Sequence, residues 1–171
     1  GRRLKVIGRA GVGVDNIDVK AAEERGILVL NTPEAPAEAV AELTMGLMIS
    51  LARQIPLADQ AMKNGKWLKR ELEGWQLNGK TLGIIGLGNV GERVARIAKA
   101  VGMRLLITKR TPPDPALLRE LGAEYVTLRE LLQRSDVIAI HVPLTSQTHH
   151  MIGPEEFKIM KEGAFLINTS R

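Results

Sequence analysis

A glycine-rich loop between an apolar run and a helical pattern is the feature that most constrains the fold of this chain. Residues 82–85 are apolar, glycines follow at Gly86, Gly88 and Gly91, and residues 92–101 have the pattern of a helix. The first glycine allows a tight turn, the second a close backbone approach to a bound group, and the third close packing of helix on strand. We therefore expect a parallel βαβ unit here.

Strands and helices alternate along the rest of the chain as well. After the loop we expect strands at 104–108, 125–126, 137–140 and 165–167, and helices at 116–121, 127–134 and 154–163. Before the loop we expect strands at 4–7 and 27–30 around a helix, an apolar helix at 37–53, an amphipathic helix at 55–63 and an extended arm at 65–80. Repeated alternation of this kind predicts an α/β fold with a parallel sheet and right-handed crossovers.

Two details of the segment before the loop carry further expectations. The helix at 37–53 is apolar nearly all round, which predicts that it is buried on most sides. Trp67 and Trp75 of the arm are expected to pack on a neighbouring domain or subunit, and a homodimer is the favoured assembly.

Composition narrows the class of protein. Hydrophobic residues make up 44% of the 171 residues and charged residues 25%, which excludes a disordered chain, and no apolar run approaches the ~20 residues that a membrane span needs. The absence of cysteine excludes disulfides and cysteine-ligated zinc and suits the cytoplasm, where we expect the protein. The net charge of +5 comes from scattered basic residues without interleaved aromatics, so neither nucleic acid nor a membrane is expected as a partner.

The glycine loop points to a dinucleotide cofactor. Backbone N–H groups at Gly88 and the N-terminus of the following helix would face a pyrophosphate, whereas the alternative is a purely structural turn. At the end of the second strand, where an acidic residue would bind the ribose of NAD, the chain has Lys109 and Arg110, and no carboxylate precedes Asp114. Two cations can neutralise a 2′-phosphate, so we expect NADP(H) over NAD(H), with a solvated basic turn as the alternative.

Motifs in order along the whole chain resemble those of the D-isomer-specific 2-hydroxyacid dehydrogenases, with D-3-phosphoglycerate dehydrogenase as the nearest subfamily. They are the runs at 11–18, 31–33, 41–43, 86–91, 141–144 and 167–171. The resemblance implies an incomplete Rossmann-type doubly wound parallel sheet at 81–171, preceded by the end of a flavodoxin-like substrate domain at 1–32 and by interdomain helices and the arm at 33–80. The chain then resembles an internal segment of a longer dehydrogenase.

The resemblance also implies roles for single residues. Arg171 matches the catalytic arginine that binds the carboxylate and carbonyl of the substrate, and Val12 and Gly13 match the loop whose amides receive that carboxylate. The cofactor-binding set comprises Gly86, Gly88, Asn89, Val90 and Gly91 at the pyrophosphate, Lys109 and Arg110, and Val142, Pro143 and Thr148 near the adenosine.

The chain departs from the family pattern in three places. Lys109 replaces the acidic residue after the second strand, as in NADP(H)-using glyoxylate and hydroxypyruvate reductases. Residues 33–38 lack the amide and hydroxyl side chains of phosphoglycerate enzymes. The proton-transferring His of the family and its Glu partner follow the motif that ends at Arg171, so we expect them outside this chain.

The histidines of the chain itself are weaker candidates. His141 stands at the end of a strand without a paired carboxylate, which disfavours it as a substitute acid or base. His149 and His150 are expected to be exposed loop residues, and no metal site is expected.

Three functions remain open on this reading. The favoured one is an NAD(P)-dependent oxidoreductase that transfers a hydride between the cofactor and a D-2-hydroxy or 2-oxo acid of the 3-phosphoglycerate, glyoxylate or hydroxypyruvate class. The alternative from another class is a dinucleotide-sensing, non-catalytic module of the corepressor type. A third is that these residues alone bind the nucleotide without turnover.

Overall fold

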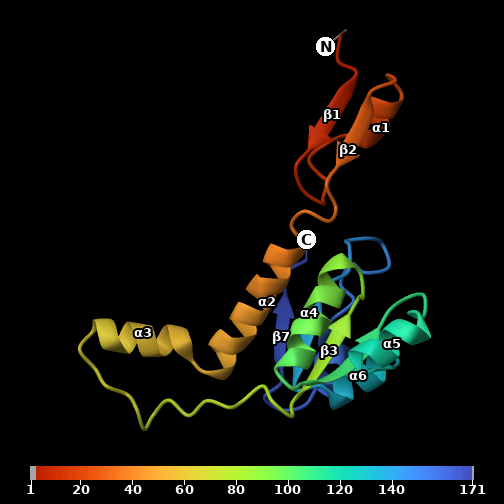
Figure 1. Cartoon of the computed structure of the whole chain (residues 1–171). Coiled ribbons are helices and arrows are strands. Elements are labelled where there is room, and N and C mark those ends of the chain that lie inside the picture. Colours follow the sequence, from red (N-terminus) through yellow and green to blue (C-terminus); the bar gives the residue numbers. More distant parts are fainter. Residues whose placement is uncertain (1–2, 171) are drawn as a thin grey trace.

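The computed structural model describes residues 3–170 and contains two parallel sheets (Figure 1). Strands β1 (Val6–Arg9) and β2 (Leu28–Asn31) form the small sheet, with α1 (Val19–Glu23) between them in sequence. Helix α2 (Ala37–Ala52) leads from this unit along the side of the large sheet, and α3 (Ile55–Lys63) extends away from the body. The five further strands and four further helices of residues 81–168 form the main body of the molecule.

The large sheet has the order β5-β4-β3-β6-β7, with every neighbouring pair parallel. Its strands are β3 (Thr81–Ile85), β4 (Arg104–Thr108), β5 (Ala123–Tyr125), β6 (Val137–Ile140) and β7 (Phe165–Asn168). The chain builds outward from β3 to β5, then returns to the other side of β3 and continues to β7. This order confirms the expected Rossmann-type doubly wound sheet and places its topological switch point between β3 and β6.

Helices cover both faces of the large sheet, as Figure 1 shows. Side chains alternate along each strand, so Leu82 and Ile84 of β3 belong to one apolar cluster and Ile85 to the other. Helices α2, α4 (Asn89–Ala100) and α5 (Pro115–Leu121) contribute to the first cluster, and α6 (Leu128–Arg134) and α7 (Pro154–Ile159) to the second. Burial on both faces explains why the strands are continuous apolar runs.

Asp136 joins three strands at their amino ends. Its carboxylate accepts the Thr81 N–H at 2.8 Å and the Lys161 ammonium at 2.9 Å, and its carbonyl accepts the Phe165 N–H at 3.0 Å. Partial burial raises the pKa of this carboxyl, but the contacts with Lys161 and Thr81 outweigh burial, and the net pKa is lower than usual. The ionised carboxylate thus links β3, β6 and β7 at the amino edge of the sheet, opposite its carboxyl edge.

The structure differs from expectation at two strands and two helices: β1 lies two residues later than expected, and β5 begins two residues earlier. Helix α2 is buried along one face only, against α4 and β7, and its opposite face exposes Leu43, Leu47 and Leu51. Although α2 is apolar on nearly all sides, it is therefore not buried on all sides within residues 3–170. Helix α7 ends at Ile159, earlier than expected, because Met160 adopts an extended backbone, and Gly163 with φ of 74° lies in the turn before β7.

The arm at 65–80 contains no helix or strand, as expected. Trp75 packs on Phe165 of β7 with a ring separation of 5.2 Å, and the Lys80 ammonium lies 5.6 Å from the Trp75 ring. Trp67 is 73% exposed instead. One tryptophan thus anchors the arm to the main body, while the other contacts little of the described chain. The division into domains at residues 32 and 80 stays a prediction.

No helix within residues 3–170 has both the length and the apolar character needed to cross a bilayer.

Replacing Gly83 with alanine should test the tight packing of α6 on the large sheet. A Cβ at this position would lie 2.3 Å from Ser135 Oγ and 2.4 Å from a methyl group of Leu131, both of which are buried. We expect Gly83→Ala to lower the free energy of unfolding by about 1–3 kcal/mol in a urea titration. Gly46→Ala is the control, because α2 offers open space there, and the change should be neutral or stabilise by about 0.5–1 kcal/mol. Equal effects of the two changes would contradict this account.

Candidate functional site

The loops that follow the strands of the large sheet converge on its carboxyl edge, because all five strands are parallel. The glycine loop follows β3, the basic turn of Lys109 and Arg110 follows β4, and His141 follows β6. Thr169 follows β7. Arg171 lies outside the described residues, so its expected catalytic role stays a prediction.

The glycine loop has no room for side chains at two of its three glycines. A Cβ at Gly86, where φ is 97°, would lie 2.6 Å from the carbonyl oxygen of His141, and a Cβ at Gly91 would lie 2.1 Å from that of Gly86. Gly88 differs, since a Cβ there would meet open space. The first and third glycines therefore let β3, β6 and α4 approach one another, and the second leaves an open backbone surface.

This surface suits a pyrophosphate. Helix α4 has twelve residues, begins at Asn89 and has Gly88 at its N-cap, which provides no side chain to bind the first N–H groups of the helix. Free N–H groups and the helix dipole favour an anion at such an end. The Arg93 side chain donates to the Asn89 carbonyl at 2.9 Å and to Glu38 of α2 at 2.6 Å, which ties this helix end to α2. We call the glycine loop at 86–91 together with the first turn of α4 the glycine cradle. The cradle thus fits a dinucleotide, and the roles of its residues stay predictions.

The basic turn after β4 is held by main-chain contacts. The Thr108 carbonyl accepts the Gly86 N–H at 2.9 Å, and the Tyr125 hydroxyl donates to the Lys109 carbonyl at 2.9 Å. The side chains of Lys109 and Arg110 are exposed. The first carboxylate downstream, Asp114, accepts the Ala116 N–H at 2.8 Å as the N-cap of α5. The turn therefore presents positive charge beside the glycine loop, while the first acidic side chain after it in the sequence is engaged as a helix cap.

The loop after β6 borders the glycine loop. A Cβ at Gly86 would lie 2.8 Å from Val142 Cγ1, so Val142 directly adjoins the cradle. The Thr148 hydroxyl donates to the Pro143 carbonyl at 2.5 Å and accepts the Thr145 N–H at 2.8 Å. Thr148 thus shapes this loop, and the expected adenosine contacts of Val142, Pro143 and Thr148 stay predictions.

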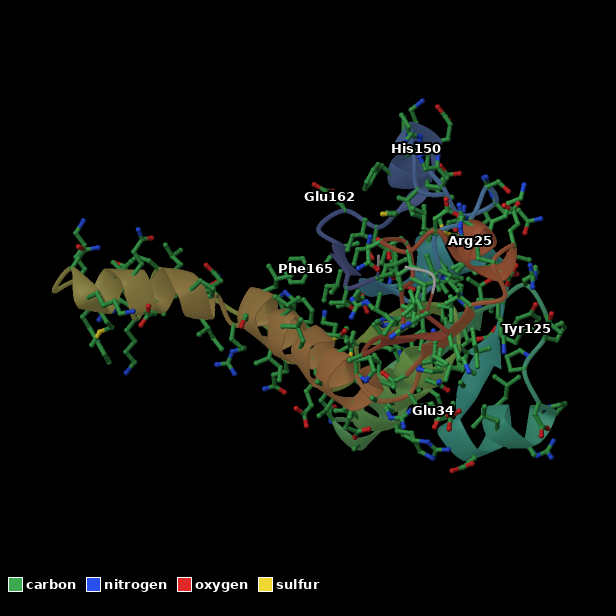
Figure 2. All side chains as sticks on the ribbon, turned by 90° about the horizontal axis from the view of Figure 1, so that it is seen from above. Arg25, Glu34, Tyr125, His150, Glu162 and Phe165 are labelled. Carbon is green, nitrogen blue, oxygen red and sulfur yellow. The ribbon has the colours of Figure 1, made fainter. Side chains whose placement is uncertain are left out.

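The two histidines later in this loop are stacked on each other. The rings of His149 and His150 are 3.7 Å apart, and Figure 2 shows His150 at the periphery of the molecule. Both are exposed, as expected. Within residues 3–170, no group of three or more His, Asp or Glu side chains is arranged to hold a metal ion.

His141 is largely buried at the start of this loop. Burial lowers the pKa of its imidazole from 6.5 to about 4, and Nε2 has no hydrogen-bond partner among the described residues. A neutral imidazole at pH 7 is a poor proton donor. This geometry disfavours His141 as a substitute catalytic acid, in line with the missing carboxylate partner.

The loop after β1 belongs to the small sheet, and residues at the end of β2 hold it in place. Thr32 accepts the Gly11 N–H at 2.9 Å, and the Asn31 side chain donates to the Val12 carbonyl at 2.8 Å. No role was expected for Asn31 and Thr32 from the sequence, although both belong to the motif at 31–33. They fix the backbone at Gly11 and Val12, directly before Gly13, and the expected contact of Val12 and Gly13 with a substrate carboxylate stays a prediction.

Comparison with known proteins identifies a family match. The model for the NAD-binding domain of D-isomer-specific 2-hydroxyacid dehydrogenases matches residues 45–171. The matched segment contains the large sheet, the glycine loop and the second half of α2.

Individual relatives agree with this match. The chain is 50% identical to a hydroxypyruvate reductase of Thermotoga maritima, with all of this chain and 55% of that protein covered. It is 49% identical to a D-3-phosphoglycerate dehydrogenase of Methanocaldococcus jannaschii, with 99% and 32% covered. The solved D-lactate dehydrogenase of Aquifex aeolicus, complexed with NAD and lactic acid, is 40% identical with a TM-score of 0.88, and 99% of this chain and 50% of that chain are covered. The chain thus spans about half or less of the length of these relatives.

The buried His141 should make stability fall as the solution becomes mildly acidic. In the unfolded chain the imidazole binds a proton below about pH 6.5, whereas in the folded chain it stays neutral down to about pH 4. Unfolding therefore takes up a proton in this window, and we expect the free energy of unfolding to fall by about 1–2 kcal/mol between pH 7 and 5. The measurement is urea unfolding of the wild type and of His141→Asn, which cannot titrate. A wild type with no steeper pH dependence than this variant would refute the assignment.

Proposed function

Because this chain belongs to the D-isomer-specific 2-hydroxyacid dehydrogenases, we propose that it supplies the cofactor-binding part of an NADP(H)-dependent oxidoreductase. The proposed reaction interconverts a D-2-hydroxy acid and its 2-oxo acid, of the 3-phosphoglycerate, glyoxylate or hydroxypyruvate class. The observation that carries the proposal is the glycine cradle at the topological switch point, within the segment that matches the family. Parallel α/β sheets bind their ligands at this point.

In the proposed reaction, different residues of the chain bind the cofactor and the substrate. When bound, the nicotinamide cofactor donates or accepts the hydride. Gly88 and the first turn of α4 hold its pyrophosphate through backbone N–H groups. The amides of Val12 and Gly13 orient the substrate carboxylate, and the Arg171 guanidinium binds that carboxylate and polarises the adjacent carbonyl.

The preference for NADP(H) rests on the charge of the turn after β4. Lys109 and Arg110 are exposed beside the glycine loop, and Asp114 is engaged as a helix cap. A ribose bearing a 2′-phosphate therefore meets cations, and a plain ribose meets no free carboxylate from residues 108–114.

The proposed assembly is a homodimer formed through α2, α3 and the arm. These segments expose apolar side chains that a monomer would leave in water: Leu43, Leu47, Leu51, Ile55, Leu57 and Trp67. The proposed location is the cytoplasm, which suits a chain without cysteine.

Oxidation of NADPH tests the proposed activity. The protein that contains this chain should oxidise NADPH with glyoxylate, hydroxypyruvate or phosphohydroxypyruvate, whereas a sensor of the corepressor type would bind NADPH and leave it intact. The chain of 171 residues alone should bind NADPH without turnover, because the acid–base His and Glu of the family are expected after Arg171. Turnover by these residues alone would contradict that expectation, and a full protein inactive with all three acids would favour the sensor.

Substitution of the basic turn tests the cofactor preference. Each charge-assisted hydrogen bond to the 2′-phosphate is worth about 1.5–3 kcal/mol, so Lys109→Ala with Arg110→Ala should weaken NADPH binding at least about tenfold. NADH binding should change little, because NADH has no 2′-phosphate. Arg104→Ala is the matched control, since Arg104 is an exposed cation at the other end of β4. Titration by fluorescence gives both affinities, and a wild type that prefers NADH would overturn the proposal.

A further inference from the structure

The three residues before Arg171 are fixed by side-chain hydrogen bonds. Asn168 Oδ1 accepts the Ser170 N–H at 2.9 Å, and Ser170 Oγ donates to the Ile140 carbonyl at 2.7 Å. Thr169 Oγ1 lies 2.9 Å from Thr44 Oγ1. The first two bonds stay within the sheet, whereas the third reaches across to α2.

Thr44 is an unusual partner for such a contact, because it is completely buried in a helix whose buried face is otherwise apolar or small. Its hydroxyl donates to the Val40 carbonyl at 2.8 Å. A threonine hydroxyl has one hydrogen, so Thr44 cannot also donate to Thr169. Only one arrangement of donors therefore satisfies the two hydroxyls and the Val40 carbonyl. In this order, Thr169 donates to Thr44 and Thr44 donates to the Val40 carbonyl.

This order makes the Thr44 hydroxyl the acceptor that orients Thr169. Thr169 is half-buried, and a hydroxyl that loses its acceptor away from water costs about 1–3 kcal/mol, enough to favour another position of the chain at Thr169. The hydrogen bond between Thr44 and Thr169 also joins α2 to the end of β7, although the two residues are 125 positions apart in the sequence. The same helix follows the unit that carries Val12 and Gly13.

We propose that Thr44 is a positioning residue for Arg171, acting through Thr169. The inference rests on the proposed function, in which Arg171 binds the 2-oxo acid. Thr44 holds the segment that leads into the arginine at a constant place relative to α2. Since α2 also follows the unit that carries Val12 and Gly13, with only residues 32–36 between β2 and α2, this one bond helps to set the spacing of the two groups that bind the substrate carboxylate.

Two substitutions at Thr44 separate the hydroxyl from its volume. Thr44→Val keeps the shape and removes the acceptor, whereas Thr44→Ser keeps the acceptor and removes a methyl group. In the protein that contains this chain, Thr44→Val should lower kcat/KM for glyoxylate about tenfold or more, because small displacements of a substrate-binding group are costly. Affinity for NADPH should change less than twofold, and Thr44→Ser should retain kcat/KM within about twofold to threefold.

A second pair of measurements isolates the contact with Thr169. Thr169→Val should reproduce the loss of Thr44→Val, and the double variant should be no worse than either single one, because both remove the same bond. Amide hydrogen exchange of residues 165–170 should be faster in Thr44→Val than in Thr44→Ser, and this readout does not depend on turnover. Thermal unfolding checks that each variant is folded under the assay conditions.

The possible outcomes distinguish this inference from the proposed function. Wild-type kcat/KM in Thr44→Val, equal losses in Thr44→Val and Thr44→Ser, or an equal loss of NADPH affinity would each overturn the positioning role. A wild-type protein that turns over none of the 2-oxo acids would instead refute the proposed function. Exchange and equilibrium binding of glyoxylate would then decide whether Thr44 still orders the segment before Arg171.

Discussion

The absence of side chains where α4 meets the glycine loop is the constraint on which the site depends. Gly91 approaches the Gly86 carbonyl, and Gly86 approaches the His141 carbonyl, at separations that exclude a Cβ. Any larger residue would push α4 away from β3 or β3 away from β6. Strands β3 and β6 and helix α4 therefore meet at one point, and the open backbone at Gly88 is held there before any ligand arrives. Donors that need no rearrangement bind an anion at lower entropic cost.

Local signals in the sequence were sufficient to predict most of the fold. The bounds of α3, β4 and β6 agree with expectation because Asn64 and Gly65 end one helix, and because short apolar runs between turns define the two strands. Glycine positions were equally informative, since the demand for a missing Cβ is local to the loop. The predicted end of α7 was wrong by several residues, because Pro154 indicates where the helix starts and no comparable residue indicates its end at Ile159.

Properties that depend on distant contacts could not be predicted. The face of α2 that is buried depends on what α4 and β7 place beside it, which a uniformly apolar helix does not reveal. The pKa of His141 depends on burial, whereas the sequence shows only that it ends a strand. Thr44 and Thr169 meet across 125 residues, and nothing near either of them indicates the other. The close approaches at Gly86 and Gly91 were thus predictable from the sequence, whereas the contacts between distant residues were not.

The Tyr125 hydroxyl binds the turn after β4 through the Lys109 carbonyl and not through the Lys109 side chain. Every amino acid presents the same carbonyl, so the path of the turn is independent of the residue at this position. The charge of the side chain at position 109 can therefore change in a single substitution without loss of this contact. A turn held in this way separates the charge that it presents from the stability of the fold, which allows related proteins to diverge in one while they share the other.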